Sequence, residues 1–280
     1  MKFGLISLDF RRFPLERCFA IAHRYGYDGV EIWGGRPHAA PQDMDAAAVQ
    51  AIKAMKRRFC LEVPMYTPAV LGMGLCLCSE SDAERSDAIR LYEKAAEVAS
   101  ELEVPSVLAV ADHPGYEADP QDTWRRLVDS AVTLADYAAP LGVDFCFEPL
   151  TPVESPVLTT ADDCVRLLAD ADRPNLCAML DVVPPTVVCE PMSSYFAKLG
   201  GKMRHIHLCN SDGVTDAHLA FDDGVLSIPD VLRLFTEIHY QGFVVAELYS
   251  ATTKDPELVA AQTMRLINEA EALLEGPNRP

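Results

Sequence analysis

Four residues that could bind a metal ion or move a proton each stand at the end of a short apolar run. They are Glu148, Asp181, His207 and Glu247, at successive separations of 33, 26 and 40 residues. Three carboxylates and an imidazole that converged would repel one another unless a positive charge lay among them. An oxygen-rich set with one histidine suits Mn²⁺, Mg²⁺, Co²⁺ or a catalytic Zn²⁺. One such carboxylate alone would as readily cap a helix or pair with an arginine, but four in register favour a shared cation site.

Two further histidines, His205 and His113, could also take part in chemistry. His205 and His207 have the spacing of a strand, in which alternate residues share a face. The outer His207 is the better ligand, and we expect His205 deeper in the fold. His113, in Asp112-His113-Pro114, could meet substrate hydroxyl groups or hydrogen-bond to nearby backbone.

Other residues near predicted strand ends could line a pocket, namely Glu31, Trp33 and Tyr66. Aromatic residues buried at such positions more often serve packing. Whether any of these side chains meet the four candidate ligands depends on the elements that carry them.

Short runs rich in valine, isoleucine, leucine and phenylalanine alternate with longer amphipathic stretches along the chain. The runs predict eight strands, over Phe3–Leu8, Val30–Trp33, Leu61–Tyr66, Ser106–Ala111, Val143–Glu148, Cys177–Asp181, His205–Leu208 and Phe243–Glu247. The stretches predict helices near residues 14–25, 44–58, 84–102, 121–140, 160–170, 192–201, 228–239 and 256–275. Near-continuous apolar strands separated by helices indicate a parallel sheet covered on its outer side.

Eight units of about 35 residues favour a single-domain (β/α)8 barrel, an α/β fold, over residues 1–280. The competing doubly wound sheet usually carries a glycine-rich phosphate turn after its first strand. Here the first predicted strand runs into residues 9–14, DFRRFP, which contain no glycine. In a barrel, the carboxyl ends of all strands form one face, so the four candidate ligands would meet there.

The chain has 42 acidic and 24 basic residues, a formal net charge of −18. Nucleic-acid backbones and anionic membranes attract Lys and Arg, so this excess argues against a large footprint on either. No apolar run approaches the roughly 18 residues of a transmembrane helix, and charged residues interrupt the amino terminus before a signal-peptide core. The nine scattered cysteines predict reduced thiols in a cytoplasmic protein.

Longer motifs extend over most of the chain. They are GYDGVEIWGGRPH at 26–38, YTP at 66–68, EPLTPVES at 148–155, SYFAKLG at 194–200, SDG at 211–213 and DAH at 216–218. Together with the four strand-end residues, these motifs resemble the xylose isomerase-like TIM barrels, a family of sugar isomerases and epimerases. The EIWGGRPH run at 31–38 is specific and resembles the fructoselysine 3-epimerase branch, whereas the strand-end set is common to the superfamily.

The resemblance implies a metal-dependent ketose 3-epimerase that interconverts fructoselysine and psicoselysine, or a similar ketose. Inversion at C3 would remove the proton next to the carbonyl, pass through an enediolate and return a proton on the other face. In the family, the glutamates that match Glu148 and Glu247 move these protons and also bind the metal. We expect Mn²⁺, with Co²⁺, Mg²⁺, Ni²⁺ and Zn²⁺ as alternatives, and a homodimer or homotetramer.

Substrate contacts are expected from the residues named above and from three others. The resemblance implies that Glu154 contacts sugar oxygens, and Arg36 could bind the carboxylate of an Amadori substrate as a fork. Simpler ketose 3-epimerases have a histidine and an arginine where this chain has Pro184 and Gly213. His218 is the expected substitute, and the same two absences favour the fructoselysine branch.

Three alternatives stay open. An isomerase or carbon–glycoside-cleaving enzyme acting on 3-oxo-sugars would use the same metal and the same enolisation. The motif at 216–218 also resembles a zinc-binding loop of apurinic endonucleases, but Pro184 replaces a histidine they need, and the net charge opposes DNA binding. A barrel that only binds a sugar or a metal would have no need of the paired acids Glu148 and Glu247.

Overall fold

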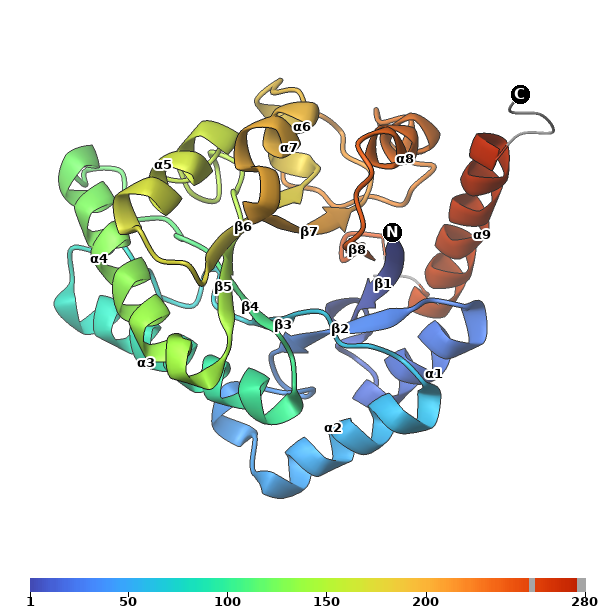
Figure 1. Ribbon diagram of the computed structural model, residues 1–280, viewed down its shortest axis with the longest axis horizontal. Coiled ribbons are helices and arrows are strands. Elements are labelled where there is room, and N and C mark those ends of the chain that lie inside the picture. Colours follow the sequence, from blue (N-terminus) through green and yellow to red (C-terminus); the bar gives the residue numbers. More distant parts are fainter. Residues whose placement is uncertain (252–254, 276–280) are drawn as a thin grey trace.

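The computed structural model describes residues 1–251 and 255–275, and its eight strands close into one parallel barrel (Figure 1). The strands are β1 (Lys2–Ile6), β2 (Gly29–Gly34), β3 (Tyr66–Pro68), β4 (Ser106–Ala109), β5 (Asp144–Phe147), β6 (Leu176–Asp181), β7 (Met203–Leu208) and β8 (Phe243–Ala246). Each strand pairs in parallel with the next, and β8 pairs with β1. The predicted α/β barrel is therefore confirmed.

Helices surround the barrel on its outer side (Figure 1). The α-helices are α1 (Leu15–Tyr25), α2 (Ala46–Phe59), α3 (Asp82–Leu102), α4 (Pro120–Ala138), α5 (Ala161–Ala171), α6 (Val183–Val187), α7 (Ser193–Leu199), α8 (Ile228–Glu237) and α9 (Pro256–Glu275). Short 3-10 turns are η1 (Ser7–Phe10), η2 (Pro41–Asp43), η3 (Ala139–Leu141) and η4 (Gly200–Lys202). The sequence does not predict α6, because this segment, VPPTV, carries two prolines and is only five residues long.

The third strand differs from its predicted position. The sequence predicts it over Leu61–Tyr66, whereas the structure has β3 over Tyr66–Pro68 and only an isolated bridge between Glu62 and Gly29. Pro64 has no N–H group to donate to a neighbouring strand, so the apolar run cannot pair along its length. The third strand thus starts later and ends closer to the carboxyl-terminal face of the barrel.

The first strand also ends earlier than predicted, at Ile6 instead of Leu8. The chain turns there into η1, where two polar side chains bond to the backbone of neighbouring elements. The Ser7 hydroxyl accepts the N–H of Trp33 at 2.8 Å, and the Asp9 carboxylate accepts the N–H of Leu248 at 3.2 Å. These bonds tie the η1 segment to the ends of β2 and β8.

The strands form the core of the barrel because they are buried on both faces, and every residue of β4 and β6 is buried. All nine cysteines are free thiols and seven of them are buried, as expected for reduced structural residues. Among the described residues, no helix is long and apolar enough to cross a membrane.

Candidate active site

The four candidate ligands converge at the carboxyl ends of β5 to β8. Asp181 and His207 lie within β6 and β7, whereas Glu148 and Glu247 come directly after β5 and β8. The backbone N–H groups of Glu148 and Glu247 still donate to the neighbouring strand, to the carbonyls of Ala109 at 2.9 Å and Leu208 at 3.2 Å. Each of the four offers one atom, and these atoms all lie within 4.8 Å of one another. The fold therefore brings these four side chains together.

His207 stands at the centre of this cluster and faces carboxylates on both sides. Its Nδ1 lies 2.8 Å from Oε2 of Glu247 and 3.0 Å from Oε1 of Glu148. Its Nε2 lies 3.0 Å from Oε1 of Glu31, a side chain with no solvent exposure. Glu31 also contacts Nε2 of His205 at 2.7 Å and accepts the Thr67 hydroxyl. Nε2 of His207 is thus held by Glu31, and Nδ1 faces Glu148 and Glu247.

His218 packs against the cluster from the loop after β7. Its Nε2 lies 2.8 Å from Oδ2 of Asp181 and 3.4 Å from Oε2 of Glu247, and its Nδ1 donates to the Asp216 carbonyl at 2.9 Å. The ring also lies on Tyr249, with centroids 4.7 Å apart. Both ring nitrogens thus face oxygen acceptors, an arrangement that favours the imidazolium form of His218.

Burial and charge set the protonation of this cluster. Burial raises the pKa of Glu148 to about 8, and the carboxylates of Glu247 and Asp181 add to this. Burial lowers the pKa of His218, but the carboxylates of Asp181 and Glu247 outweigh it and raise that pKa to about 10. Burial also opposes ionisation of Glu31, yet its two histidine neighbours hold the Glu31 pKa well below the ordinary value.

The donor set fits a divalent cation. Burial raises the pKa of Glu148, and the nearby carboxylates of Glu247 and Asp181 raise it further, so ionisation of all three carboxylates is disfavoured unless a positive charge lies among them. A cation held by Glu148, Asp181, His207 and Glu247 would supply that charge with oxygen and nitrogen ligands, which Mn²⁺ and Mg²⁺ accept.

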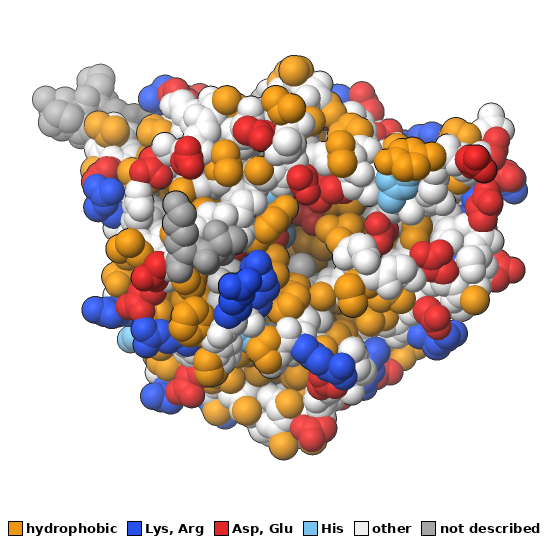
Figure 2. All heavy atoms as spheres, turned by 180° about the vertical axis from the view of Figure 1, so that it is seen from behind, with side chains coloured by type: hydrophobic (Ala, Val, Ile, Leu, Met, Phe, Trp, Pro, Cys, Tyr) orange, Lys and Arg blue, Asp and Glu red, His pale blue; other side chains and the backbone are white. Residues whose placement is uncertain are grey.

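A cavity of about 530 Å³ lies over the cluster. Figure 2 shows a hollow in this face of the molecule, with Lys or Arg side chains beside it. The lining residues are Leu8, Arg11, Leu71, Gly72, Asp112, His113, Glu148, Leu150, Glu154, Asp181, Asp216, His218, Glu247 and Tyr249. Three of the expected substrate contacts, His113, Glu154 and His218, are therefore placed at the cavity.

The other three expected contacts lie away from this lining. Tyr66 is fully buried, and its hydroxyl donates to the Ala39 carbonyl. The Trp33 ring packs edge-on against His38, with centroids 6.1 Å apart. The Arg36 guanidinium is 68% exposed and pairs with Asp43 at 2.5 Å. Trp33, Tyr66 and Arg36 thus have structural partners of their own.

The sequence does not predict the roles of two charged residues in or under the site. Arg11 lines the cavity from the end of η1, in a segment whose sequence shows no motif for ligand binding. Glu31 is expected to line a pocket, but it lies beneath His207 instead. Glu31 and His207 are far apart in the sequence, so no local pattern indicates their contact.

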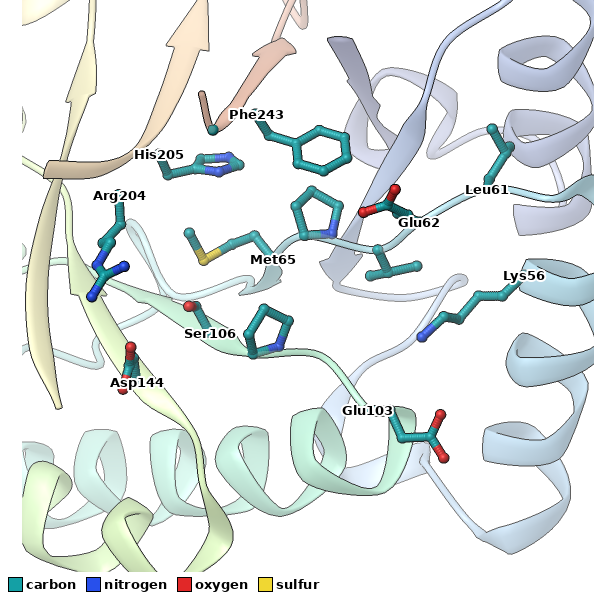
Figure 3. A pocket seen from close by; sticks show the side chains of 14 residues that line it. Lys56, Leu61, Glu62, Met65, Glu103, Ser106, Asp144, Arg204, His205 and Phe243 are labelled. Atoms are coloured by element: carbon teal, nitrogen blue, oxygen red, sulfur yellow. The ribbon is translucent and has the colours of Figure 1, made fainter. Parts of the chain in front are cut away.

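A second cavity, of about 480 Å³, lies at the amino ends of the strands (Figure 3). His205 and Phe243 point into it from β7 and β8, beside Met65. At this end, Lys56 donates to the Leu102 carbonyl at 2.8 Å. In barrels of this kind, the amino end usually serves stability, and chemistry is carried at the carboxyl end.

The sequence profile of the xylose isomerase-like TIM barrel family matches residues 19–270, so the chain belongs to this family. Fructoselysine 3-epimerase of Escherichia coli O157:H7 is 35% identical over 264 residues, which cover 94% of this chain and 96% of that protein. L-ribulose 3-epimerase of Methylomonas sp. (strain DH-1) is 23% identical over 90% of this chain and 84% of that protein. These relatives are epimerases, and the predicted enzyme of the isomerase class is confirmed.

Solved structures show the same fold. D-psicose 3-epimerase from Clostridium cellulolyticum H10, solved with D-tagatose, superposes with a TM-score of 0.81 at 18% identity, covering 97% of this chain and 98% of that one. The apo form of 3-keto-D-glucoside 4-epimerase from E. coli gives 0.82 at 17% identity, covering 96% and 99%. At these identities, the likeness concerns the fold alone.

Proposed function

We propose that this protein is a metal-dependent ketose 3-epimerase that interconverts fructoselysine and psicoselysine or a close analogue. The observation that carries the proposal is the set of four ligand atoms within 4.8 Å, which includes two glutamates from different strands. The 35% identity to a fructoselysine 3-epimerase over nearly the whole chain supports the choice of substrate.

The order of the strands supports a role for the two glutamates as the acid–base pair. Glu148 follows β5 and Glu247 follows β8, so they are the outermost members of a set whose inner members come from β6 and β7. Nδ1 of His207 lies between them, at 3.0 Å and 2.8 Å. Inversion at C3 needs one proton-transfer group on each face of the carbon, and two flanking carboxylates meet that need.

A divalent cation bound by the four ligands would act as a Lewis acid and as a template for the two substrate oxygens next to C3. In one direction Glu247 removes the C3 proton and Glu148 delivers a proton to the opposite face of C3, and in the other direction the two roles are exchanged. The imidazolium of His218, beside Asp181 and Glu247, stabilises negative charge that develops on the substrate oxygens. Glu154, held by the Thr151 N–H at 3.1 Å, faces the same cavity and accepts sugar hydroxyl groups.

A deuterium wash-in experiment tests the proposal. The enzyme with Mn²⁺ is expected to exchange the C3 hydrogen of fructoselysine or psicoselysine with D2O, detected by mass spectrometry. Glu148→Gln and Glu247→Gln should each lower exchange by about 10²- to 10⁴-fold, because each removes a general acid–base group. Glu62→Gln, at the opposite end of the barrel, is the matched control and should exchange like wild type. Exchange that persists in both cavity variants contradicts the assignment of the pair.

We also infer Mn²⁺ as the physiological metal and a homodimer or homotetramer as the assembly, both supported by family likeness. Metal analysis of protein purified without added metal tests the first inference, and light scattering tests the second. A monomer with stoichiometric Zn²⁺ would contradict both.

A further inference from the structure

The charges around the substrate cavity are unequal. Six carboxylates line it, those of Asp112, Glu148, Glu154, Asp181, Asp216 and Glu247. Among the described lining residues, Arg11 is the single Lys or Arg. A guanidinium placed among so many acids would be expected to pair with one of them, because an ion pair would lower the energy of both.

Arg11 has no such pair in the described part of the chain. Among the described residues, its one hydrogen bond runs from Nη1 to the carbonyl oxygen of Leu8, at 3.4 Å, within the same turn. The side chain is partly exposed, and it lies where β1 passes through η1 to the cavity edge. Most of its five donors therefore stay available to a ligand in the cavity.

We propose that Arg11 binds the carboxylate of the substrate's amino-acid end and so selects carboxylate-bearing ketosamines over simple ketoses. This inference rests on the proposed function. A planar guanidinium binds a carboxylate through two parallel hydrogen bonds, a geometry that neither a sugar hydroxyl nor an ammonium group can reproduce.

The remaining acids fit the rest of such a substrate. Glu148, Asp181 and Glu247 belong to the ligand cluster, which leaves the carboxylates of Asp112, Glu154 and Asp216 to meet the rest of a substrate in the cavity. Fructoselysine carries two amino groups that are positively charged near neutral pH, together with one carboxylate. A cavity with several acids and one arginine matches that pattern, whereas a neutral ketose would use neither kind of charge.

The structure favours Arg11 over Arg36 for this role. Arg36 is paired through Nε and Nη2 with the two carboxylate oxygens of Asp43, at 2.5 Å and 2.6 Å, so its fork is already occupied. Arg36 also lies outside the lining of the cavity, whereas Arg11 lies within it.

A pair of substrates that differ only in the carboxylate tests the inference. Fructoselysine is compared with the fructosyl derivative of 1,5-diaminopentane, which has the same chain without the carboxylate. For the manganese-loaded wild type, we expect kcat/KM to favour fructoselysine by about 10- to 100-fold, as for a charged hydrogen-bonded pair. Arg11→Gln should abolish that preference, chiefly by weakening the reaction of fructoselysine, and Arg11→Lys should keep part of it.

The matched control is Arg12→Gln, which removes the same charge from the neighbouring, exposed position. It should keep the full preference. A preference that survives Arg11→Gln, or one that Arg36→Gln abolishes, overturns the inference. Dissociation constants of both compounds, measured by calorimetry, give the same comparison without turnover. If neither compound exchanges at C3, yet binding still favours the carboxylate-bearing compound through Arg11, the proposed function fails and the carboxylate-binding role of Arg11 stands.

Discussion

At the scale of single residues, Glu31 explains why His207 can serve as a ligand. Glu31 lies 3.0 Å from one ring nitrogen of His207 and leaves the other facing Glu148 and Glu247. His205 and the Thr67 hydroxyl hold Glu31 from its other sides. A carboxylate behind a metal-binding histidine fixes its tautomer and orientation and raises the basicity of the ring.

Glu31→Gln should therefore weaken metal binding. The amide keeps the size of the side chain but removes the charge, so we expect the dissociation constant for Mn²⁺ to rise by about 10- to 100-fold. Electron paramagnetic resonance of free Mn²⁺ during a titration measures this directly, without reference to turnover. Glu62→Gln, which removes a negative charge at the amino end of the barrel, is the control. Unchanged affinity in Glu31→Gln would contradict the positioning role.

The cluster and its supports differ in how far the sequence predicts them. Glu148, Asp181, His207 and Glu247 end consecutive apolar runs, and in a parallel barrel that pattern alone places them on one face. The contact between Glu31 and His207 joins β2 to β7 across the barrel. The two residues are 176 positions apart in the sequence, so no local pattern predicts that they meet.

At the scale of elements, alternation of apolar runs with amphipathic stretches predicts the barrel well, because each period reflects one buried strand and one half-buried helix. It fails at the third strand, where the apolar run of residues 61–66 satisfies the strand pattern but Pro64 withholds a donor. It also fails at α6, since two prolines disfavour a helix in the sequence but are accepted in its first turn.

The close approach of β2 to its neighbours yields a prediction about stability. A Cβ at Gly29 would lie 2.8 Å from the Glu62 carbonyl oxygen and 2.8 Å from a ring carbon of Phe243. The carbonyl belongs to the backbone and cannot rotate away, so Gly29→Ala should lower the free energy of unfolding by about 1–3 kcal/mol. Urea denaturation measures this change.

Gly201→Ala, in η4, is the matched control, because a Cβ there has no atom within 4 Å. It should change stability by less than about 0.5 kcal/mol. Equal effects of the two substitutions would show that the approach at Gly29 relaxes without cost.

At the scale of the whole molecule, the cluster ties four consecutive strands together at one end of the barrel. A cation bound there would bridge β5 to β8. It would bind the folded chain and not the unfolded one, since successive ligands are 26 to 40 residues apart in the sequence. Metal binding is therefore expected to add directly to the stability of the whole barrel.

Thermal unfolding measures this coupling. At a Mn²⁺ concentration of about 100 times the dissociation constant, binding should stabilise the folded state by about 2.7 kcal/mol. For a chain of this size, that corresponds to a rise in Tm of about 4–6 °C over the protein in EDTA. Asp181→Asn should lose most of the rise, because it removes a ligand, while Asp129→Asn, on an exposed part of α4, should keep it. Equal Tm values with Mn²⁺ and with EDTA would show that the four side chains do not hold this cation, whatever their geometry.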